Sequence, residues 1–266
     1  MYWINGQSQQ YLPLTDRAIQ FGDGFFTTAL IRAGRVELMA YHLERLAQAA
    51  ERLLFPPPDW QALTHEMNQV AELRQQGVLK VIISRGSGGH GYSPTGCAAP
   101  LRIISHRPVP AQYAAWRASG VKLALSPIRL ARGSLLAGIK HLNRLEQVLI
   151  RAHLDRVADA GEALVLDTRG MVVECCAANI FWRKGDEVFT PALEHAGVAG
   201  VMRRHILRQL AASPFRVRLV EAVATELESA DEAIVCNALM PVLPVTAIDQ
   251  RRYDSRTLFD FVSPNC

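Results

Sequence analysis

Residues 43–84 read LERLAQAAERLLFPPPDWQALTHEMNQVAELRQQGVLKVIIS, and this stretch indicates the class of fold. Apolar residues recur at helical spacing from Leu43 to Leu54, and three consecutive prolines at 56–58 end that helix. A second helix is predicted over residues 59–76, and the apolar, β-branched run 78–84 predicts a strand. Helix and strand periods alternate in this way along the whole chain, so we predict an α/β (α+β) fold.

The same patterns extend outward from this stretch. Strands are predicted at 2–6, 121–126, 164–167, 171–174, 179–183, 188–190 and 233–236, and helices at 142–157, after Gly200, and from the capping box at 225–228. The segment around Pro108 and Pro110 has mixed polarity, which is typical of a linker. We therefore predict an N-terminal α/β domain at 1–107, a linker at 108–119 and a C-terminal α/β domain at 120–266.

Composition excludes several classes of protein. The 266 residues are 49% hydrophobic and 20% charged, enough for a full core and unlike a disordered chain. The N-terminus lacks a basic, apolar leader, and no run approaches the roughly 20 apolar residues of a membrane helix. We expect an unexported protein without a membrane segment.

Charged and sulfur-containing residues support this expectation. Only four of the 29 basic residues are lysines, and the arginines are scattered among 25 acidic residues, which indicates ion pairs and not a nucleic-acid footprint. The five cysteines form no Cys-x-x-Cys pair. Reduced thiols in the cytoplasm are the simplest interpretation.

Two stretches begin like known motifs, a dinucleotide-binding glycine loop and a zinc-protease site, but each lacks a part that its motif requires. The loop GSGGHG at 86–91 follows a strand, but residues 92–96 (YSPTG) cannot open the helix of a dinucleotide site. Two interpretations of this loop remain: a loop that closes over a ligand, and a plain connection between elements. His65-Glu66 begins a zinc-protease motif, but Gln69 stands where the second histidine belongs, so no metal site is predicted.

Lys140 differs from the other lysines, which fall in predicted strands or in a charged turn. It lies in AGIKHLN at 137–143, a small-residue approach to a helix start. A desolvated amine there could act as a nucleophile or a base, and an ordinary surface lysine is the alternative.

Glu174 ends an apolar strand and is followed by the small residues 175–178. If buried, its carboxylate needs a cationic partner such as a cofactor ring nitrogen; a water-exposed hairpin glutamate is the alternative. Residues 197–203 (GVAGVMR) form a glycine-bracketed turn into a helix, whose first N–H groups can bind an anion.

Five stretches, in order along the chain, resemble motifs of the fold-type IV pyridoxal-phosphate enzymes, the family of branched-chain and D-amino-acid aminotransferases. They are DRAIQFGDGFFTT at 16–28, HLERL at 42–46, KHLN at 140–143, ECCAAN at 174–179 and GVAGVMR at 197–203. The resemblance implies a two-domain fold with pyridoxal 5'-phosphate between the domains, the lysine in the C-terminal domain, and commonly a homodimer.

The resemblance also implies roles for individual residues. Lys140 matches the lysine that binds the cofactor covalently, Glu174 the partner of the pyridine nitrogen, and Arg45 a phosphate ligand. The backbone at Val201 and Met202 matches the phosphate cradle.

Two positions depart from the transaminases, because Met202 and Ala238 replace threonines that contact the phosphate. Backbone N–H groups, with Asn237, are expected to take over these contacts, and Ala178 completes the expected cofactor-binding set. Thr28 falls where the transaminases have Gly or Val facing the substrate, so the resemblance implies a hydroxyl near the reacting centre.

His90 occupies the loop position where the similar D-amino-acid transaminases carry a carboxylate-binding arginine, so the resemblance makes it a candidate for substrate binding. Arg85, at the start of the same loop, is a second candidate.

Within the family, residues 138–146, 174–179 and 236–241 are most similar to members that cleave 4-amino-4-deoxychorismate. The implied activity is a carbon–oxygen lyase that forms 4-aminobenzoate and pyruvate for folate biosynthesis, with Lys140 taking the C4 proton and Thr28 or Lys140 protonating the leaving group. Two alternatives remain: a D- or branched-chain aminotransferase, and a non-catalytic protein that binds an acidic ligand or nucleic acid.

Overall fold

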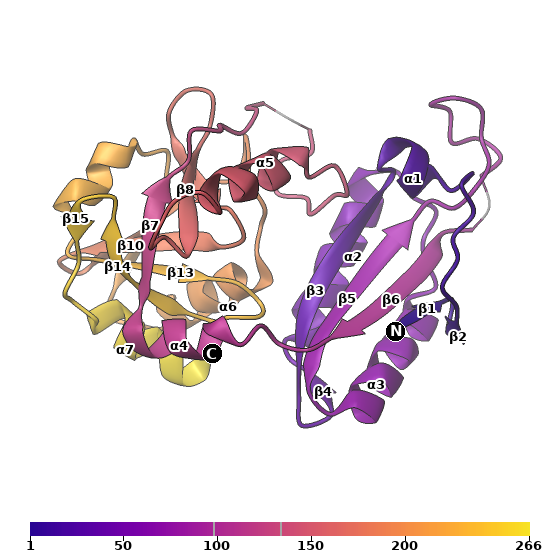
Figure 1. Cartoon of the computed structure of the whole chain (residues 1–266), viewed down its shortest axis with the longest axis horizontal. Coiled ribbons are helices and arrows are strands. Elements are labelled where there is room, and N and C mark those ends of the chain that lie inside the picture. The colour runs from indigo at the N-terminus through magenta and orange to yellow at the C-terminus, as the bar shows by residue number, and fades with distance from the viewer. Residues whose placement is uncertain (98, 134) are drawn as a thin grey trace. The chain divides into compact units, whose positions relative to one another are not determined.

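The computed structural model describes residues 1–97, 99–133 and 135–266. The chain forms two compact units (Figure 1). The first comprises Met1–Val109 and Ile139–Asn143, and the second comprises Pro110–Gly138 and Arg144–Cys266. Where the sequence predicted a linker at 108–119, helix α4 (Gln112–Ser119) forms within the second unit. The alanine-containing run after Pro110 is long enough to close helical turns, so the prolines mark a boundary and not an extended connection.

The first unit is built on a six-stranded antiparallel sheet in the order β2-β1-β6-β5-β3-β4. Its strands are β1 (Tyr2–Ile4), β2 (Gln7–Ser8), β3 (Gly24–Arg32), β4 (Arg35–Val36), β5 (Gly77–Ser84) and β6 (Leu101–Arg107). Its helices are α1 (Arg17–Phe21), α2 (Met39–Arg52) and α3 (Trp60–Arg74). The predicted helix–proline–helix–strand order of residues 43–84 is therefore confirmed.

One face of this sheet forms the core of the first unit. Phe25, Thr27 and Ala29 of β3 are fully buried there, and apolar residues of α2 and α3 pack in the same core. Figure 1 shows α2 and α3 against this sheet. The alternate residues Phe26 and Thr28 point to the other face and are only half-buried. This period of two follows from strand geometry, and it decides which residues of β3 reach a site on the second face.

The segment Ile139–Asn143 joins the first unit through β3. The Phe26 N–H donates to the Lys140 carbonyl at 2.9 Å, and the Leu142 N–H donates to the Gly24 carbonyl at 3.0 Å. Through these backbone bonds the segment with Lys140 is grouped with the N-terminal strands, although residues 138 and 144 on either side of it belong to the second unit.

The second unit contains a nine-stranded mixed sheet in the order β12-β11-β10-β13-β14-β7-β8-β9, with β15 paired to β14. The strands are β7 (Val121–Leu125), β8 (Glu162–Leu166), β9 (Val172–Cys175), β10 (Asn179–Lys184), β11 (Glu187–Pro191), β12 (Arg216–Val220), β13 (Glu232–Cys236), β14 (Leu243–Ile248) and β15 (Arg251–Arg252). Besides α4, the helices are α5 (Leu145–Leu154), α6 (Val201–Leu210), α7 (Thr257–Val262), and the 3-10 helices η1 (Ala224–Ser229) and η2 (Ser263–Asn265).

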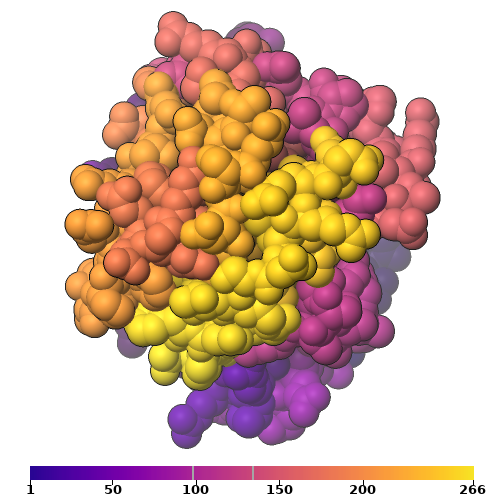
Figure 2. All heavy atoms as spheres, turned by 90° about the vertical axis from the view of Figure 1, so that its left-hand side faces the viewer, coloured from indigo at the N-terminus to yellow at the C-terminus, as the bar shows by residue number. Residues whose placement is uncertain are grey.

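A buried carboxylate fixes the C-terminal helix of this unit. Glu232 in β13 accepts hydrogen bonds from the Leu258 and Phe259 N–H groups, both at 2.8 Å, and so caps α7. The C-terminal residues then lie over the surface of the second unit beside α6 (Figure 2).

Two helix predictions need correction. The predicted capped helix at 225–228 is the 3-10 helix η1, which begins after Val223 without a side-chain cap. The predicted helix 142–157 is shorter, and three of its apolar residues face outward: Leu145, Val148 and Leu149 are 78%, 60% and 52% exposed. Periodicity found the helix but not which face packs on the sheet.

None of the helices in the described part of the chain is both long and apolar enough to traverse a lipid bilayer.

Candidate active site

Two lysines, a threonine and a phenylalanine lie together on the face of the first sheet that α2 and α3 do not cover. Thr28 in β3 lies directly opposite Lys80 in β5. The Nζ atoms of Lys80 and Lys140 each lie 4.7 Å from the centroid of the Phe26 ring. Thr28, Phe26, Lys80 and Lys140 therefore surround one patch of half-buried surface.

From the sequence, Lys80 was an ordinary lysine in a predicted strand. Burial instead lowers its pKa, and the positive charge of Arg107 lowers it further. The strand pattern alone could not reveal this, because Arg107 and Phe26, which lie near Lys80, belong to other strands, β6 and β3.

Arg45 is linked to two buried polar residues that the sequence did not single out. Its Nη2 donates to Thr27 Oγ1, and Thr27 Oγ1 lies 2.6 Å from His42 Nδ1. Thr27 and His42 are 0% and 1% exposed. Burial lowers the pKa of His42 to about 3, with a further contribution from the charge of Arg45. The imidazole is therefore neutral throughout the working range of pH.

Glu174 is buried in β9, so the alternative of a water-exposed hairpin glutamate is wrong. Its Oε2 accepts the Val198 N–H at 2.8 Å. Gly197 makes this approach possible: at φ +85°, a Cβ there would lie 2.6 Å from Val173 Cγ1 and 3.3 Å from Glu174 Oε2. Burial lowers the pKa of Arg144, and the nearby Glu174 carboxylate opposes that shift.

Helix α6 begins beside this carboxylate with its first N–H groups uncapped by a side chain. Gly200 is the N-cap, and a Cβ there would collide with the Asn179 amide oxygen. The side chains of Val201 and Met202 are buried, so this turn presents its backbone N–H groups. The missing threonine hydroxyl at position 202 is consistent with a cradle made of backbone donors.

Asn237 organises the loop after β13. Its Oδ1 accepts the N–H groups of Leu239 and Met240 at 2.8 and 2.9 Å, and its Nδ2 donates to the Ala177 carbonyl at 2.9 Å. The side chain thus ties the loop containing Ala238 to the turn containing Ala178.

Arg85 has a structural environment. Its guanidinium donates to the Leu53 and Leu54 carbonyls at 2.8 and 3.0 Å and to Asp23 at 2.8 Å, and lies 3.9 Å from the Phe55 ring centroid. These contacts use the donors that a substrate carboxylate would need, so a substrate role for Arg85 is not supported.

His90 is exposed on the loop after β5, and Arg17 holds that loop. The Arg17 guanidinium donates to the Gly91 and Tyr92 carbonyls at 2.9 and 3.2 Å and pairs with Asp23 at 2.8 Å. Sequence analysis missed Arg17, whose partners lie about 75 residues away in the chain.

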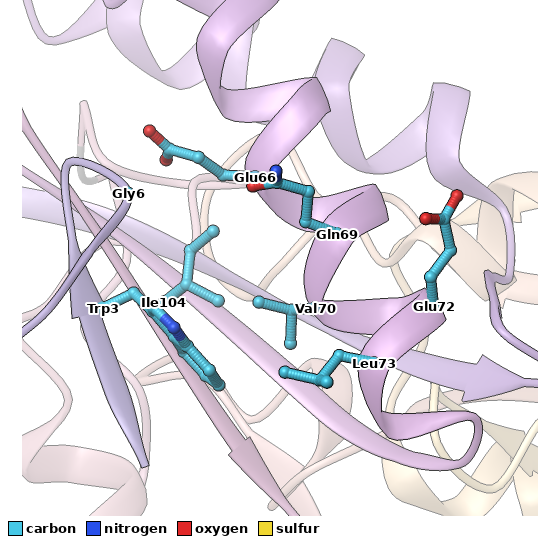
Figure 3. Close-up of a pocket in the computed structure, with 8 residues that line it drawn as sticks. All are labelled: Trp3, Gly6, Glu66, Gln69, Val70, Glu72, Leu73 and Ile104. Carbon is cyan, nitrogen blue, oxygen red and sulfur yellow. The ribbon is translucent and has the colours of Figure 1, made fainter.

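The first unit also contains a cavity of about 440 Å³ between α3 and the sheet, lined by Trp3, Gly6, Glu66, Gln69, Val70, Glu72, Leu73 and Ile104 (Figure 3). Ile104 pairs with Val81, one residue along from Lys80, so it points to the helix-covered face. The cavity is thus on the opposite side of the sheet from Lys80 and Thr28.

Comparison with known proteins defines the class. A family model described as Amino-transferase class IV matches residues 24–248, and the chain belongs to this family. The crystal structure of 4-amino-4-deoxychorismate lyase from Pseudomonas aeruginosa superposes with a TM-score of 0.94 at 35% identity, covering 99% of this chain and 97% of that one.

A curated relative agrees with this assignment, and a more distant structure shows the same fold. The aminodeoxychorismate lyase of Vibrio harveyi is 41% identical over 93% of this chain and 91% of its own length. A hypothetical aminotransferase from Mycobacterium tuberculosis in a PLP-bound form has the same fold, with a TM-score of 0.86 at 23% identity over 99% and 96% of the two chains.

Proposed function

We propose that this protein is a pyridoxal-phosphate-dependent lyase that converts 4-amino-4-deoxychorismate to 4-aminobenzoate and pyruvate in folate biosynthesis. The observation that carries the proposal is the placement of Lys140 and Thr28 around Phe26, in a chain 41% identical to the lyase of Vibrio harveyi. An amine and a hydroxyl on one face of a sheet supply a base and a proton donor for an elimination.

The residues present fit the cofactor. Glu174 offers a buried carboxylate for a protonated ring nitrogen, and the uncapped start of α6 offers N–H groups to a phosphate, for which Arg45 adds a positive charge. Lys140 would hold the cofactor covalently. When bound, the cofactor supplies an electron-withdrawing ring that stabilises negative charge next to the substrate amine.

The reaction requires two proton movements by the chain. Once the substrate amine has taken its place and its own amine is free, Lys140 accepts the proton from C4 of the substrate. The C3–O bond then breaks as the ring becomes aromatic. The enolpyruvate that leaves gains a proton from Thr28 or Lys140 and becomes pyruvate. Electrons and atoms balance without an oxidant or an amino acceptor, and aromatisation drives the elimination forward.

Lys80 suits the substrate's carboxylates. It adds a second positive charge beside the same Phe26 ring, and its partial burial strengthens the attraction to an anion. With Arg85 engaged elsewhere, we assign Lys80 to substrate binding, together with the exposed His90.

We further propose a cytoplasmic homodimer. The outward stripe of Leu145, Val148 and Leu149 on α5 is typical of an interface. All five cysteines are free thiols, which suits a reducing compartment.

The test supplies 4-amino-4-deoxychorismate without any keto acid and follows 4-aminobenzoate and pyruvate. Equimolar products are expected from the parent protein and from Lys122→Ala, a control in β7, but none from Lys140→Ala. Keto-acid-dependent amino transfer from D-alanine or leucine without lyase products would instead identify an aminotransferase. Protein without the visible absorbance of a lysine-bound cofactor, before or after reconstitution, would identify a binding protein.

A further inference from the structure

We infer that Thr27 and His42 are positioning residues that hold the Arg45 guanidinium in place for a phosphate group. The inference rests on the proposed cofactor role of Arg45. It adds a buried hydrogen-bond chain, from Arg45 through Thr27 to His42, to the residues that determine how tightly the phosphorylated cofactor binds.

The direction of this chain follows from its donors and acceptors. A guanidinium can only donate, so the bond between Arg45 Nη2 and Thr27 Oγ1 uses a lone pair of the hydroxyl. The hydroxyl proton is then free to point to His42 Nδ1, 2.6 Å away. The neutral imidazole accepts it when its own proton is on Nε2, so every member of the chain has a defined role.

The local structure brings these residues together. His42 and Arg45 are three positions apart on α2 and therefore lie on one face of the helix. Thr27 lies on the helix-covered face of β3, on which α2 packs. Because Thr27 and His42 are almost completely buried, water does not compete for their hydrogen bonds.

A histidine at position 42 lowers the stability of the folded protein, because part of its imidazole is buried without a hydrogen bond to the residues that the structure describes. Within the described residues, its Nε2 is buried without a hydrogen-bond partner. A leucine could fill similar space without a buried polar atom, so packing alone does not explain a histidine. The bond at Nδ1 is the interaction that a leucine could not provide.

Fixing Arg45 in advance has a direct consequence for binding. An arginine side chain loses rotamer freedom when it grips an anion, and a guanidinium that is already held loses less. The effect should therefore depend on the ligand's phosphate and be absent for a ligand without one.

The experiment compares pyridoxal 5'-phosphate with pyridoxal, which lacks the phosphate, by titration of apoprotein. Thr27→Val and His42→Leu remove the two side-chain groups, whereas Thr27→Ser keeps the hydroxyl and His42→Asn keeps an acceptor near the position of Nδ1. We expect Thr27→Val and His42→Leu to weaken binding of the phosphorylated ligand about tenfold and to leave pyridoxal binding unchanged. The two conservative variants should bind both ligands like the parent.

Arg45→Met tests the phosphate role of Arg45 separately from its positioning by Thr27 and His42. The quantity to compare is the affinity for pyridoxal 5'-phosphate divided by the affinity for pyridoxal. If Arg45→Met leaves this ratio unchanged, the proposed phosphate role of Arg45 is wrong. If it lowers the ratio while Thr27→Val and His42→Leu do not, only the positioning inference is overturned. An equal loss of affinity for both ligands in those variants would also overturn it, because that indicates general loosening. Thr27→Ala replaces Thr27→Val in the same comparison if the latter does not fold.

Discussion

Thr27 and Thr28 are chemically identical neighbours, yet their environments differ because successive side chains of a strand alternate between faces. Thr27 is fully buried under α2 and bonds to Arg45 and His42. Thr28 is half-buried on the other face, opposite Lys80. One strand thus supplies a proposed positioning residue and a proposed proton donor.

Lys80→Met should raise KM for 4-amino-4-deoxychorismate about tenfold with a smaller change in kcat, because it removes a charge but keeps the length of the apolar stem. Lys80→Arg should restore most of the affinity. Steady-state kinetics of both variants, with Lys122→Met as the control, provide the measurement. An unchanged KM in Lys80→Met would exclude a role in binding the substrate.

Glu162 should make the stability of the protein depend on pH. Its buried carboxylate accepts the Ala163 and Ala177 N–H groups at 3.0 and 3.1 Å, but burial raises its pKa from 4.5 to about 7. Between these values the folded protein keeps a proton that the unfolded chain releases. The free energy of unfolding therefore falls as pH rises through this window and stays low above it.

The matching variant is Glu162→Gln, which cannot ionise. Relative to this variant, the parent should lose about 2 kcal/mol of stability between pH 5 and pH 8, at 1.36 kcal/mol per pKa unit. Urea unfolding at several pH values measures the difference. Parallel stability curves would show that Glu162 does not carry the raised pKa.

At the scale of elements, the pairing of β3 with residues 139–143 decides where Lys140 lies. Gly24 allows this close pairing: a Cβ there would lie 2.6 Å from the Ile83 carbonyl oxygen and 2.7 Å from Leu142 Cδ1. The first of these atoms is backbone within the β3–β5 pair and cannot move without disturbing the sheet.

Gly24→Ala should therefore lower the free energy of unfolding by about 1–3 kcal/mol and also reduce kcat, since it displaces the segment that carries Lys140. Gly185→Ala is the control, because no neighbouring atom lies within 4 Å of a Cβ there. That control should cost about 1 kcal/mol for its left-handed backbone and leave kcat unchanged. Full activity in Gly24→Ala would show that the pairing does not position the lysine.

At the scale of the whole molecule, each unit has its own hydrophobic core. A ligand that binds only the folded chain stabilises it by about 2.7 kcal/mol at 100 times its Kd. Pyridoxal phosphate should therefore raise the Tm of the apoprotein by roughly 5–10 °C. Thermal melting checks this, with a smaller rise expected for Lys140→Ala; no rise in the parent would contradict cofactor binding.

The outward stripe of α5 leads to a prediction about assembly. Leu149→Asp places a charge among Leu145 and Val148, and burying it in an interface without a partner would be costly. Light scattering after size-exclusion chromatography should give a dimer for the parent and a monomer for this variant. If the parent protein is a monomer, the proposed homodimer is wrong.

Local patterns in the sequence determine much of the fold. The helices and strand of residues 43–84, the hairpin of β8 and β9, and the helix after Gly200 were all predictable, because periodicity and proline or glycine signals act within a few residues. The motifs around Lys140 and Glu174 likewise pointed to pyridoxal-phosphate chemistry, which the family assignment supports.

The sequence by itself therefore determined the family, many of the elements and the residues expected to react. Only the tertiary structure decided that Lys140 belongs with β3, that Lys80 and Lys140 both contact the Phe26 ring, that Arg85 is held by structural contacts, and that His42 supports Arg45 through Thr27. The physical reason is that a side chain's partners and pKa depend on strand register and burial. Both are set by residues far away in the chain, and no local spacing encodes them.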